Sequence, residues 1–178
     1  MRNQYRNMKT FKYSNKYIRI VKPPKITKKQ KKKIMDTPVY KRISLPLEEY
    51  INDDLIKPHE KEFVENFTNL GFKIKWICRN REKDDGSYYP TNDFIWNNEE
   101  WECKSIFNQK YSSIAKRLRI PILQGKKKFF IYMKNKKLST KLSCQLANFN
   151  IRKRTNQIER LIVLDKESVK EIILQKRK

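Results

Sequence analysis

The stretch from residue 91 to residue 105, Thr-Asn-Asp-Phe-Ile-Trp-Asn-Asn-Glu-Glu-Trp-Glu-Cys-Lys-Ser, decides the fold. Its segments 93–96 and 101–104 predict two short strands, joined by a polar turn at Asn97 and Asn98. Because side chains on a strand alternate between faces, Glu102 and Lys104 should point one way and Cys103 the other. A short hairpin would also bring Asp93 alongside Glu102 and Lys104.

Regular elements are predicted on both sides of this hairpin. An apolar stripe closed by Gly71 predicts a helix over residues 60–70, and strict alternation predicts a strand over residues 72–76. The elements predicted after the hairpin are a helix at 112–118 that ends before Pro121, a strand at 128–133, a helix at about 138–148, a strand at 161–164 and a final helix from Glu167. The order of elements predicts an α/β protein with a mixed central sheet flanked by helices.

Two carboxylates and a lysine at one end of a sheet have a recognised chemistry. Asp93 and Glu102 can hold Mg²⁺ or Mn²⁺, which prefer oxygen ligands and keep several waters. Lys104 can position or deprotonate the attacking water and neutralise phosphate charge. A metal there lowers the pKa of its bound water and polarises a phosphate. The alternative is that all three are ordinary charged residues on a solvated strand face.

A fourth acid, Glu60, lies on the apolar stripe of the first predicted helix, at an angle between Val64 and Phe67. A carboxylate that faces the core is costly unless it is paired or binds a metal. Glu60 is therefore predicted as a third acid of the site. In this register Glu62 falls outside the stripe. It is the alternative if the helix register differs.

The chain carries a formal net charge of +24. Such a charge attracts polyanions and disfavours partners whose surfaces carry few acidic groups. Residues 1–45 form a basic segment with aromatic residues among its early charges, and residues 46–178 form the predicted folded domain. The basic segment suits contact with nucleic-acid phosphates and stacking on bases, and it reads equally well as a solvated, partly disordered tail.

Several protein classes are not expected from the sequence. No stretch approaches the ~20 apolar residues of a membrane span, and no apolar run follows the basic start as in a secretory signal. The three cysteines are scattered, which favours reduced thiols in a cytoplasm-like compartment. With three glycines in the chain, no phosphate-cradling glycine loop is expected.

The spacing Asp93, eight residues, Glu102-x-Lys104 resembles the PD-(D/E)xK nuclease pattern. The surroundings resemble a narrower family, the C-terminal tRNase-type toxin domain of contact-dependent inhibition proteins. The segments that carry the resemblance are 59–62 (His-Glu-Lys-Glu), Gly71, 91–94 (Thr-Asn-Asp-Phe), 101–105 (Trp-Glu-Cys-Lys-Ser), Ser113-Ile114 and Gln124. It covers the chain from about Pro58 onward, and Asn92 stands where the family usually has proline.

The resemblance implies a restriction-endonuclease-like core and a metal-dependent phosphodiesterase, commonly one that cleaves tRNA and is neutralised by a cognate immunity protein. Glu60, Asp93 and Glu102 would be metal ligands or water-orienting acids, and Lys104 the catalytic lysine. The residues predicted to contact the substrate are Gln124 at the edge of the site, Ser105 beside the lysine, Lys126 in a turn that suits phosphate contact, and His59, which otherwise reads as a surface residue.

The leading hypothesis is a Mg²⁺-dependent (or Mn²⁺-dependent) nuclease that acts on RNA, with tRNA favoured, in the cytoplasm; secretion as a toxin stays open. One alternative is a DNA endonuclease of mobile-element or phage type, because the catalytic residues do not distinguish the sugar. The other is a catalytically inactive nucleic-acid-binding protein. An intact set of acids and lysine counts against a pure binding module, which has no reason to place carboxylates against a phosphate.

Overall fold

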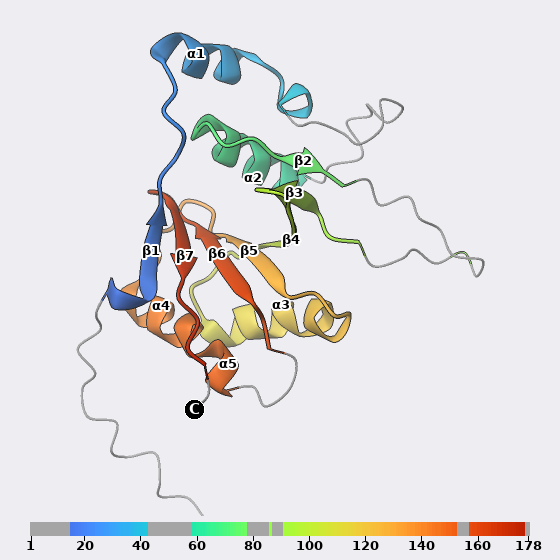
Figure 1. The fold of residues 1–178 in the computed structure, drawn as a ribbon, viewed down its shortest axis with the longest axis vertical. Coiled ribbons are helices and arrows are strands. Elements are labelled where there is room, and N and C mark those ends of the chain that lie inside the picture. Colours follow the sequence, from blue (N-terminus) through green and yellow to red (C-terminus); the bar gives the residue numbers. More distant parts are fainter. Residues whose placement is uncertain (1–14, 43–57, 78–85, 87–90, 153–156, 177–178) are drawn as a thin grey trace, which may run out of the picture.

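The computed structural model describes residues 15–42, 58–77, 86, 91–152 and 157–176. Seven strands form one mixed sheet in the order β1-β7-β6-β5-β4-β3-β2 (Figure 1). The strands are β1 (Ile18–Val21), β2 (Lys75–Trp76), β3 (Phe94–Trp96), β4 (Glu99–Ser105), β5 (Lys128–Tyr132), β6 (Arg160–Leu164) and β7 (Val169–Ile172). The central strands β4, β5 and β6 are parallel, and every other pairing is antiparallel. The predicted α/β class with a mixed sheet is confirmed.

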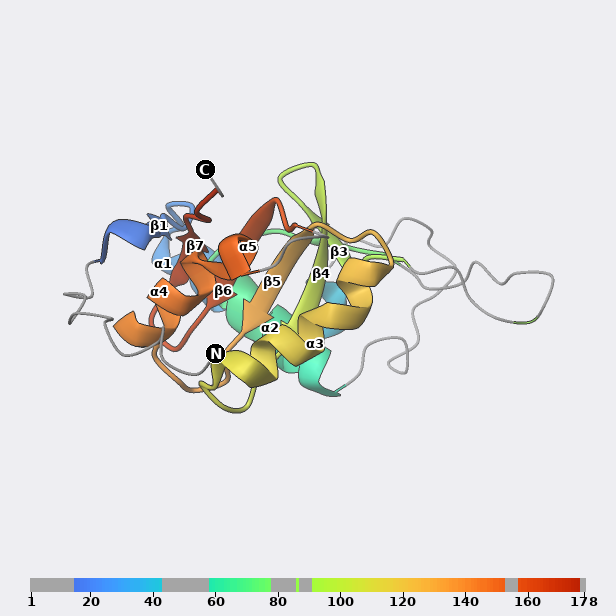
Figure 2. The same cartoon turned by 90° about the horizontal axis from the view of Figure 1, so that it is seen from below.

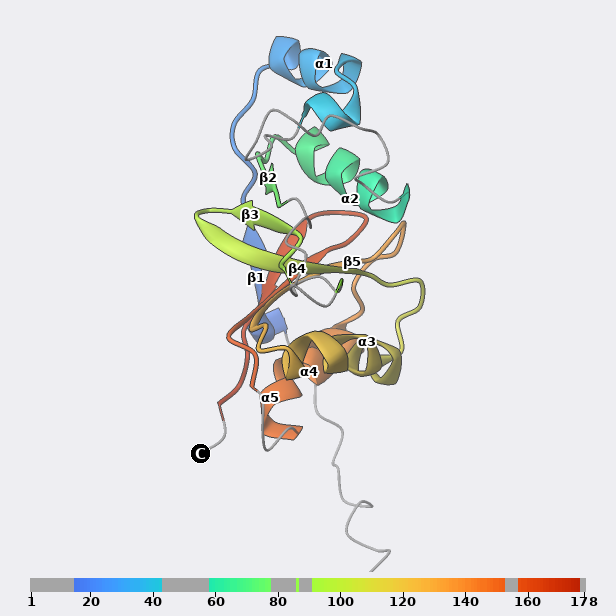
Figure 3. The same ribbon diagram turned by 90° about the vertical axis from the view of Figure 1, so that its right-hand side faces the viewer.

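Helices cover both faces of this sheet, as the end-on view in Figure 3 shows. One face carries α2 (Pro58–Asn69), with α1 (Lys28–Asp36) stacked beyond it. The other carries α3 (Tyr111–Leu123), α4 (Thr140–Ala147) and α5 (Phe149–Arg152), which follow β4 and β5 in the chain. Figure 2 shows α3 running across β4 and β5 from below. Short 3-10 turns at Asn15–Tyr17 (η1) and Val39–Lys41 (η2) complete the elements.

Each face of the sheet buries its own apolar cluster, because successive side chains on a strand alternate between faces. On β5, Phe130 and Tyr132 pack toward α2, whereas Phe129 and Ile131 pack toward α3 and α4. The α2 side is rich in rings, with Phe63 and Phe67 stacked at 5.6 Å between centroids. Such double-sided burial explains the continuous apolar run that predicted β5.

The hairpin β3–β4 forms as the sequence predicted, with Phe94 paired to Trp101 and Trp96 to Glu99. Asn97 and Asn98 both have positive φ, at 52° and 60°, which is the geometry of a type I′ turn. Asparagine tolerates this conformation better than most residues, so the sequence sets the turn and, with it, the register of both strands.

Three predictions of secondary structure were wrong in extent or type. The final helix predicted from Glu167 is the strand β7, because the carboxylate of Asp165 accepts hydrogen bonds at 2.9 Å from the amides of Glu167 and Ser168 and turns the chain back onto β6. Only the end of the predicted strand 72–76 is paired, as β2.

The third error concerns α3, which was predicted to stop before Pro121 and instead continues to Leu123. Proline removes one backbone donor and crowds the carbonyl four residues earlier, so it usually ends a helix. Here Pro121 lies in the last turn, and its ring is buried. Burial of the ring offsets the cost of one lost hydrogen bond, and the helix ends at Leu123, two residues past the proline.

Part of the basic N-terminal segment belongs to the sheet. β1 pairs with β7 at the edge of the sheet, and α1 and η2 pack against α2. The predicted boundary near Pro46 and the aromatic residues at 5, 11 and 13 lie outside the described residues.

Candidate active site around Glu102

Glu102 is the centre of the candidate site. It lies in the middle of β4 and is 4 % exposed. One carboxylate oxygen pairs with the ammonium of Lys104 and the other with the ammonium of Lys126. A buried carboxylate needs such partners, because taking its charge out of water is costly. Glu102 is therefore held between two cations.

The register of β4 fixes which way these side chains face. Glu102 pairs with Phe129 and Lys104 with Ile131 in the parallel ladder with β5, and both partners belong to the cluster under α3. Cys103 belongs to the opposite cluster, under α2. The predicted alternation is thus confirmed, with Glu102 and Lys104 together on the α3 side of the sheet.

Asp93 reaches the same region from the start of β3. Its amide donates to the carbonyl of Trp101 at 2.9 Å, and its Oδ2 accepts from the amide of Cys103 at 2.7 Å. Two bonds to the neighbouring strand anchor this residue, which is 5 % exposed. The hairpin therefore brings Asp93 beside Glu102, as the sequence predicted.

Glu60 lies in the first turn of α2 and is 6 % exposed, so the predicted burial of this acid is confirmed. It approaches from the α2 side of β4, the side of Cys103. Burial raises the pKa of the Cys103 thiol, and the charges of Asp93, Glu60 and Glu102 raise it further, whereas Lys104 lowers it. The four charged residues thus lie within electrostatic reach of one sulfur atom.

Lys126 has a position that the sequence did not predict. It was expected to contact phosphate from an exposed turn, but its side chain is 10 % exposed and donates to the carbonyl of Thr91 at 2.6 Å as well as to Glu102. The turn after α3 leads into β5, which pairs with β4, and no local pattern in the sequence reports this pairing. Lys126 therefore lies with Asp93, Glu102 and Lys104, and these four residues are called the Glu102 group below.

The other residues predicted to bind substrate are dispersed. His59 is exposed in the first turn of α2, and Gln124 is exposed at the end of α3, two residues before Lys126. Ser105 is buried at 8 % exposure and pairs with Tyr132, on the α2 side of the sheet. The structure therefore places Ser105 on the face opposite Lys104. This register does not favour contact of both residues with one substrate.

The oxygen donors at this site suit a hard divalent cation, but they do not form a ready-made cage. In the described part of the chain, no three His, Cys, Asp or Glu side chains are placed so that they could hold a metal ion. Mg²⁺ is often bound by one or two carboxylates, with waters and substrate phosphate completing its shell. Asp93 and Glu102 fit that smaller donor set.

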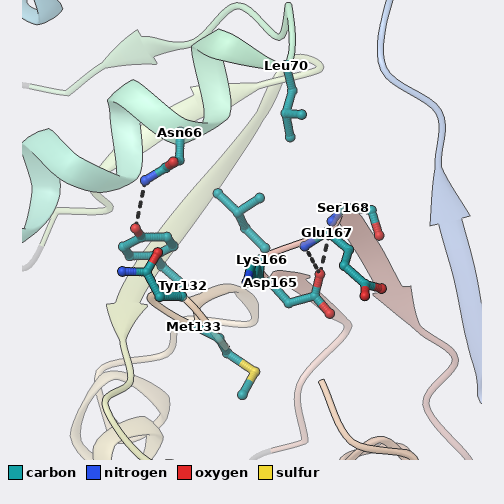
Figure 4. Close-up of a pocket in the computed structure, with 10 residues that line it drawn as sticks. Asn66, Leu70, Tyr132, Met133, Asp165, Lys166, Glu167 and Ser168 are labelled. Carbon is teal, nitrogen blue, oxygen red and sulfur yellow. Dashed lines mark hydrogen bonds between the residues drawn. The ribbon is translucent and has the colours of Figure 1, made fainter. Parts of the chain in front are cut away.

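A separate cavity of about 100 Å³ lies between α2 and the ends of β5 and β6 (Figure 4). The amide of Asn66 donates to the hydroxyl of Tyr132 at 2.7 Å on one side, and Asp165 closes the other. Burial, with the neighbouring Glu62, raises the pKa of Tyr132. None of the residues that line this cavity belongs to the Glu102 group.

Comparison with known proteins adds little to these observations. No protein-family model and no curated protein matches the sequence. Among solved structures, the chain is similar to the CdiA-CT/CdiI toxin and immunity complex from Burkholderia pseudomallei, with a TM-score of 0.47 and 14 % identity over 72 % of this chain and 98 % of that one. At these values the likeness assigns neither family nor activity, so function is argued from the site itself. No helix within the described residues is long and apolar enough to cross a membrane.

Proposed function

We propose that this chain is a metal-dependent nuclease that hydrolyses phosphodiester bonds in RNA at the site formed by Asp93, Glu102, Lys104 and Lys126. The observation that supports it most is one buried carboxylate held by two lysines beside a second buried carboxylate. An apolar core would be the more stable choice for a purely structural role, because buried charges cost free energy. Charged groups concentrated in this way are typical of functional sites.

Asp93 and Glu102 would hold the metal ion. Glu60, predicted as a third ligand, approaches β4 from the other face, and within the described residues no three such side chains are placed to hold a metal, so it is left out of the ligand set. When bound, the metal supplies a water of lowered pKa and polarises the scissile phosphate. The chain itself orients the acids, because Asp93 is anchored to the amide of Cys103 and Glu102 is fixed between two ammonium groups. The same ammonium groups can neutralise phosphate charge, which develops further in the transition state.

Lys104 is the residue that we assign to the attacking water. It is partly exposed, with 28 % of its side chain accessible, so a substrate can reach it, whereas Lys126 is 10 % exposed. Its ammonium can donate a hydrogen bond that orients the water and can neutralise charge on the phosphate. Lys126 keeps Glu102 oriented from the buried side, through its second bond to the carbonyl of Thr91.

The polymer is proposed as RNA, with tRNA as the first substrate to test, because of the sequence resemblance to tRNase-type toxin domains. A cognate immunity protein is proposed as a partner on the same ground. The site residues do not distinguish ribose from deoxyribose, so DNA is included in the test.

The decisive assay incubates the purified protein with labelled total tRNA and, separately, with plasmid DNA, in Mg²⁺, in Mn²⁺ and in EDTA. We expect cleavage of tRNA that requires the metal and is lost in Lys104→Ala. Failure to cut either polymer in any metal would refute the nuclease, and cleavage of plasmid alone would assign DNA as the substrate. Full activity of Lys104→Ala would refute the role of that lysine.

A further inference from the structure

Helix α1 is a lysine-rich element at the surface of the protein. Five of its nine residues are lysines, the only acid is Asp36 at its end, and none of its residues is buried. Lys28 and Lys32 lie one helical turn apart, as do Lys29 and Lys33, and like charges at this spacing destabilise a helix. The five lysines form no salt bridge with another described residue.

Specific bonds nevertheless hold α1 in place. At its start, the Thr27 hydroxyl accepts from the amide of Gln30 at 3.1 Å, and the Gln30 side chain accepts from the amide of Thr27 at 2.8 Å. This reciprocal capping box satisfies two donors at the start of the helix. These bonds stabilise the helix backbone that carries the lysines, despite their mutual repulsion.

At the other end, Arg42 fastens α1 to α2. Its guanidinium donates to the carbonyls of Thr37 and Met35, at 2.6 and 2.9 Å, and to the side-chain oxygen of Asn69 at 2.8 Å. Asn69 is the last residue of α2, the helix that carries Glu60. A planar guanidinium can make three such bonds at once, which a lysine cannot. The lysines of α1 are thus held at a fixed position relative to the candidate active site.

We propose that α1 is a rigid nucleic-acid docking helix, whose lysines bind backbone phosphates of the polymer that the Glu102 site cuts. The identity of that polymer rests on the proposed function. In Figures 1 and 3, β2 lies between α1 and β3, the strand that begins next to Asp93. Lys73 and Lys75 are exposed along this connection. A strand of nucleic acid that contacts α1 can continue past Lys73 and Lys75 to the edge of the sheet at β2, and it would pass round this edge to reach the Glu102 site on the α3 face.

An anionic membrane surface fits α1 less well. Helices that lie on membranes bury a wide apolar face in the lipid. The apolar residues of α1 are Ile34, which is half-buried within the protein, and Met35. Phosphate contacts need no apolar face, because their free energy comes from charge and released counterions.

The test replaces all five lysines of α1 by glutamine, which keeps helix propensity and lowers the net charge from +24 to about +19. Binding is measured by fluorescence anisotropy with a labelled 20-base-pair duplex and with labelled tRNA, in EDTA and in a Glu102→Gln background, so that cleavage does not enter. The expected result is a Kd at least about tenfold higher. The slope of the logarithm of the binding constant against the logarithm of the salt concentration should also become shallower, on the duplex by about 0.9 for each phosphate that the variant no longer neutralises.

A matched control removes the same charge elsewhere. Its five replaced lysines are exposed and lie outside α1, namely Lys110, Lys116, Lys141, Lys166 and Lys176. We expect a smaller change in Kd for this control, with both variants folded by circular dichroism. Equal increases in Kd for the two variants would overturn the proposal, because charge alone would then explain binding. Nucleic-acid binding that depends on α1, in a protein that cuts neither polymer, would leave this inference standing while the nuclease fails.

Two further measurements, on an Arg42→Lys variant and on lipid vesicles, complete the test. Arg42→Lys keeps the charge but breaks the three-way attachment, so weaker nucleic-acid binding at unchanged net charge supports a fixed docking helix, and unchanged binding overturns it. Vesicles of phosphatidylserine and phosphatidylcholine serve as the membrane probe. Loss of vesicle binding by the α1 variant, with nucleic-acid binding retained, would assign α1 to lipid and overturn the proposal.

Discussion

The ammonium of Lys126 pairs with the carboxylate of Glu102, although 24 residues separate them in the chain. Helix α3 and the turn that follows it lie between the two positions, so the contact forms only when α3 packs on the sheet and β5 aligns with β4. The pair thus links the candidate site to the parallel core of the fold. Its disruption should affect both stability and cleavage.

Lys126→Met should reduce cleavage by about 100-fold or more and lower the free energy of unfolding by about 1–3 kcal/mol, because Glu102 would lose one of its two buried partners. Chemical denaturation and single-turnover cleavage measure the two effects. The matched control is Lys127→Met, which removes an exposed pair with Glu159 and should change both quantities little. Equal effects of the two substitutions would contradict the position assigned to Lys126.

Asp93→Asn should abolish the binding of Mn²⁺ while leaving the fold nearly intact. The amide oxygen of asparagine can still accept from the amide of Cys103, but the charge that attracts the cation is gone. Isothermal titration calorimetry measures the binding without any substrate. The exposed Asp36 on α1 supplies the same type of substitution as a control, and Asp36→Asn should bind Mn²⁺ like the wild type. A Kd unchanged by Asp93→Asn would remove this residue from the ligand set.

The buried pair of Asp165 and Lys170 should make stability depend on pH. Burial alone would raise the pKa of Asp165, but the Lys170 ammonium and the amides of Leu138, Glu167 and Ser168 outweigh it and lower the pKa below the ordinary value of 3.8. The pair's contribution is therefore fully present above pH 3.8 and is lost as the pH falls through the lower folded value.

Asp165→Asn should accordingly cost about 3–5 kcal/mol near pH 7, because Lys170 would be left buried and unpaired. Urea denaturation from pH 7 to pH 3 measures the difference from the wild type, which should shrink below pH 3.8. A difference that stays constant over this range would mean that the charge of Asp165 does not stabilise the fold.

Asn98→Gly should raise the free energy of unfolding by about 0.5–1 kcal/mol, because glycine adopts the positive φ of 60° at that position without strain. Asn98→Val should lower it, since a β-branched residue is strained there. Thermal unfolding of the two variants measures the effects. If both variants melt at the same temperature, the type I′ turn does not set the β3–β4 hairpin in solution.

Local patterns predicted those parts of the fold that depend on neighbours in the chain. The hairpin around Asn97 and Asn98 and the apolar strand β5 were predicted correctly for that reason. The structure of residues 167–172 could not be, because Val169 and Ile172 fit a helical period and only pairing with β6 makes them a strand. Pro121 was likewise judged by its local cost, whereas the burial of its ring depends on the packed sheet.

The residues of the candidate site also divide into those that local sequence predicted and those that depend on the packed fold. Asp93, Glu102 and Lys104 come from one hairpin, so their proximity follows from alternation and turn length. The burial of Glu60 followed from helical periodicity. Lys126 joins them only through the parallel alignment of β5 with β4, which no local pattern reports. Ser105 was placed with Lys104 because it is next to it in sequence, but alternation turns it to the other face.

The central claim is that the Glu102 carboxylate is needed for metal-dependent cleavage, and a matched pair on β4 tests it most directly. Glu102→Gln and Glu100→Gln make the same change two residues apart on one face of the strand, the first at a buried position and the second at an exposed one. Single-turnover cleavage of tRNA in Mg²⁺ is the measurement, with folding checked by circular dichroism. We predict at least about a 1,000-fold loss for Glu102→Gln and less than about a twofold change for Glu100→Gln, on the scale typical of groups that act in the transition state. Wild-type cleavage by a folded Glu102→Gln protein would contradict the account.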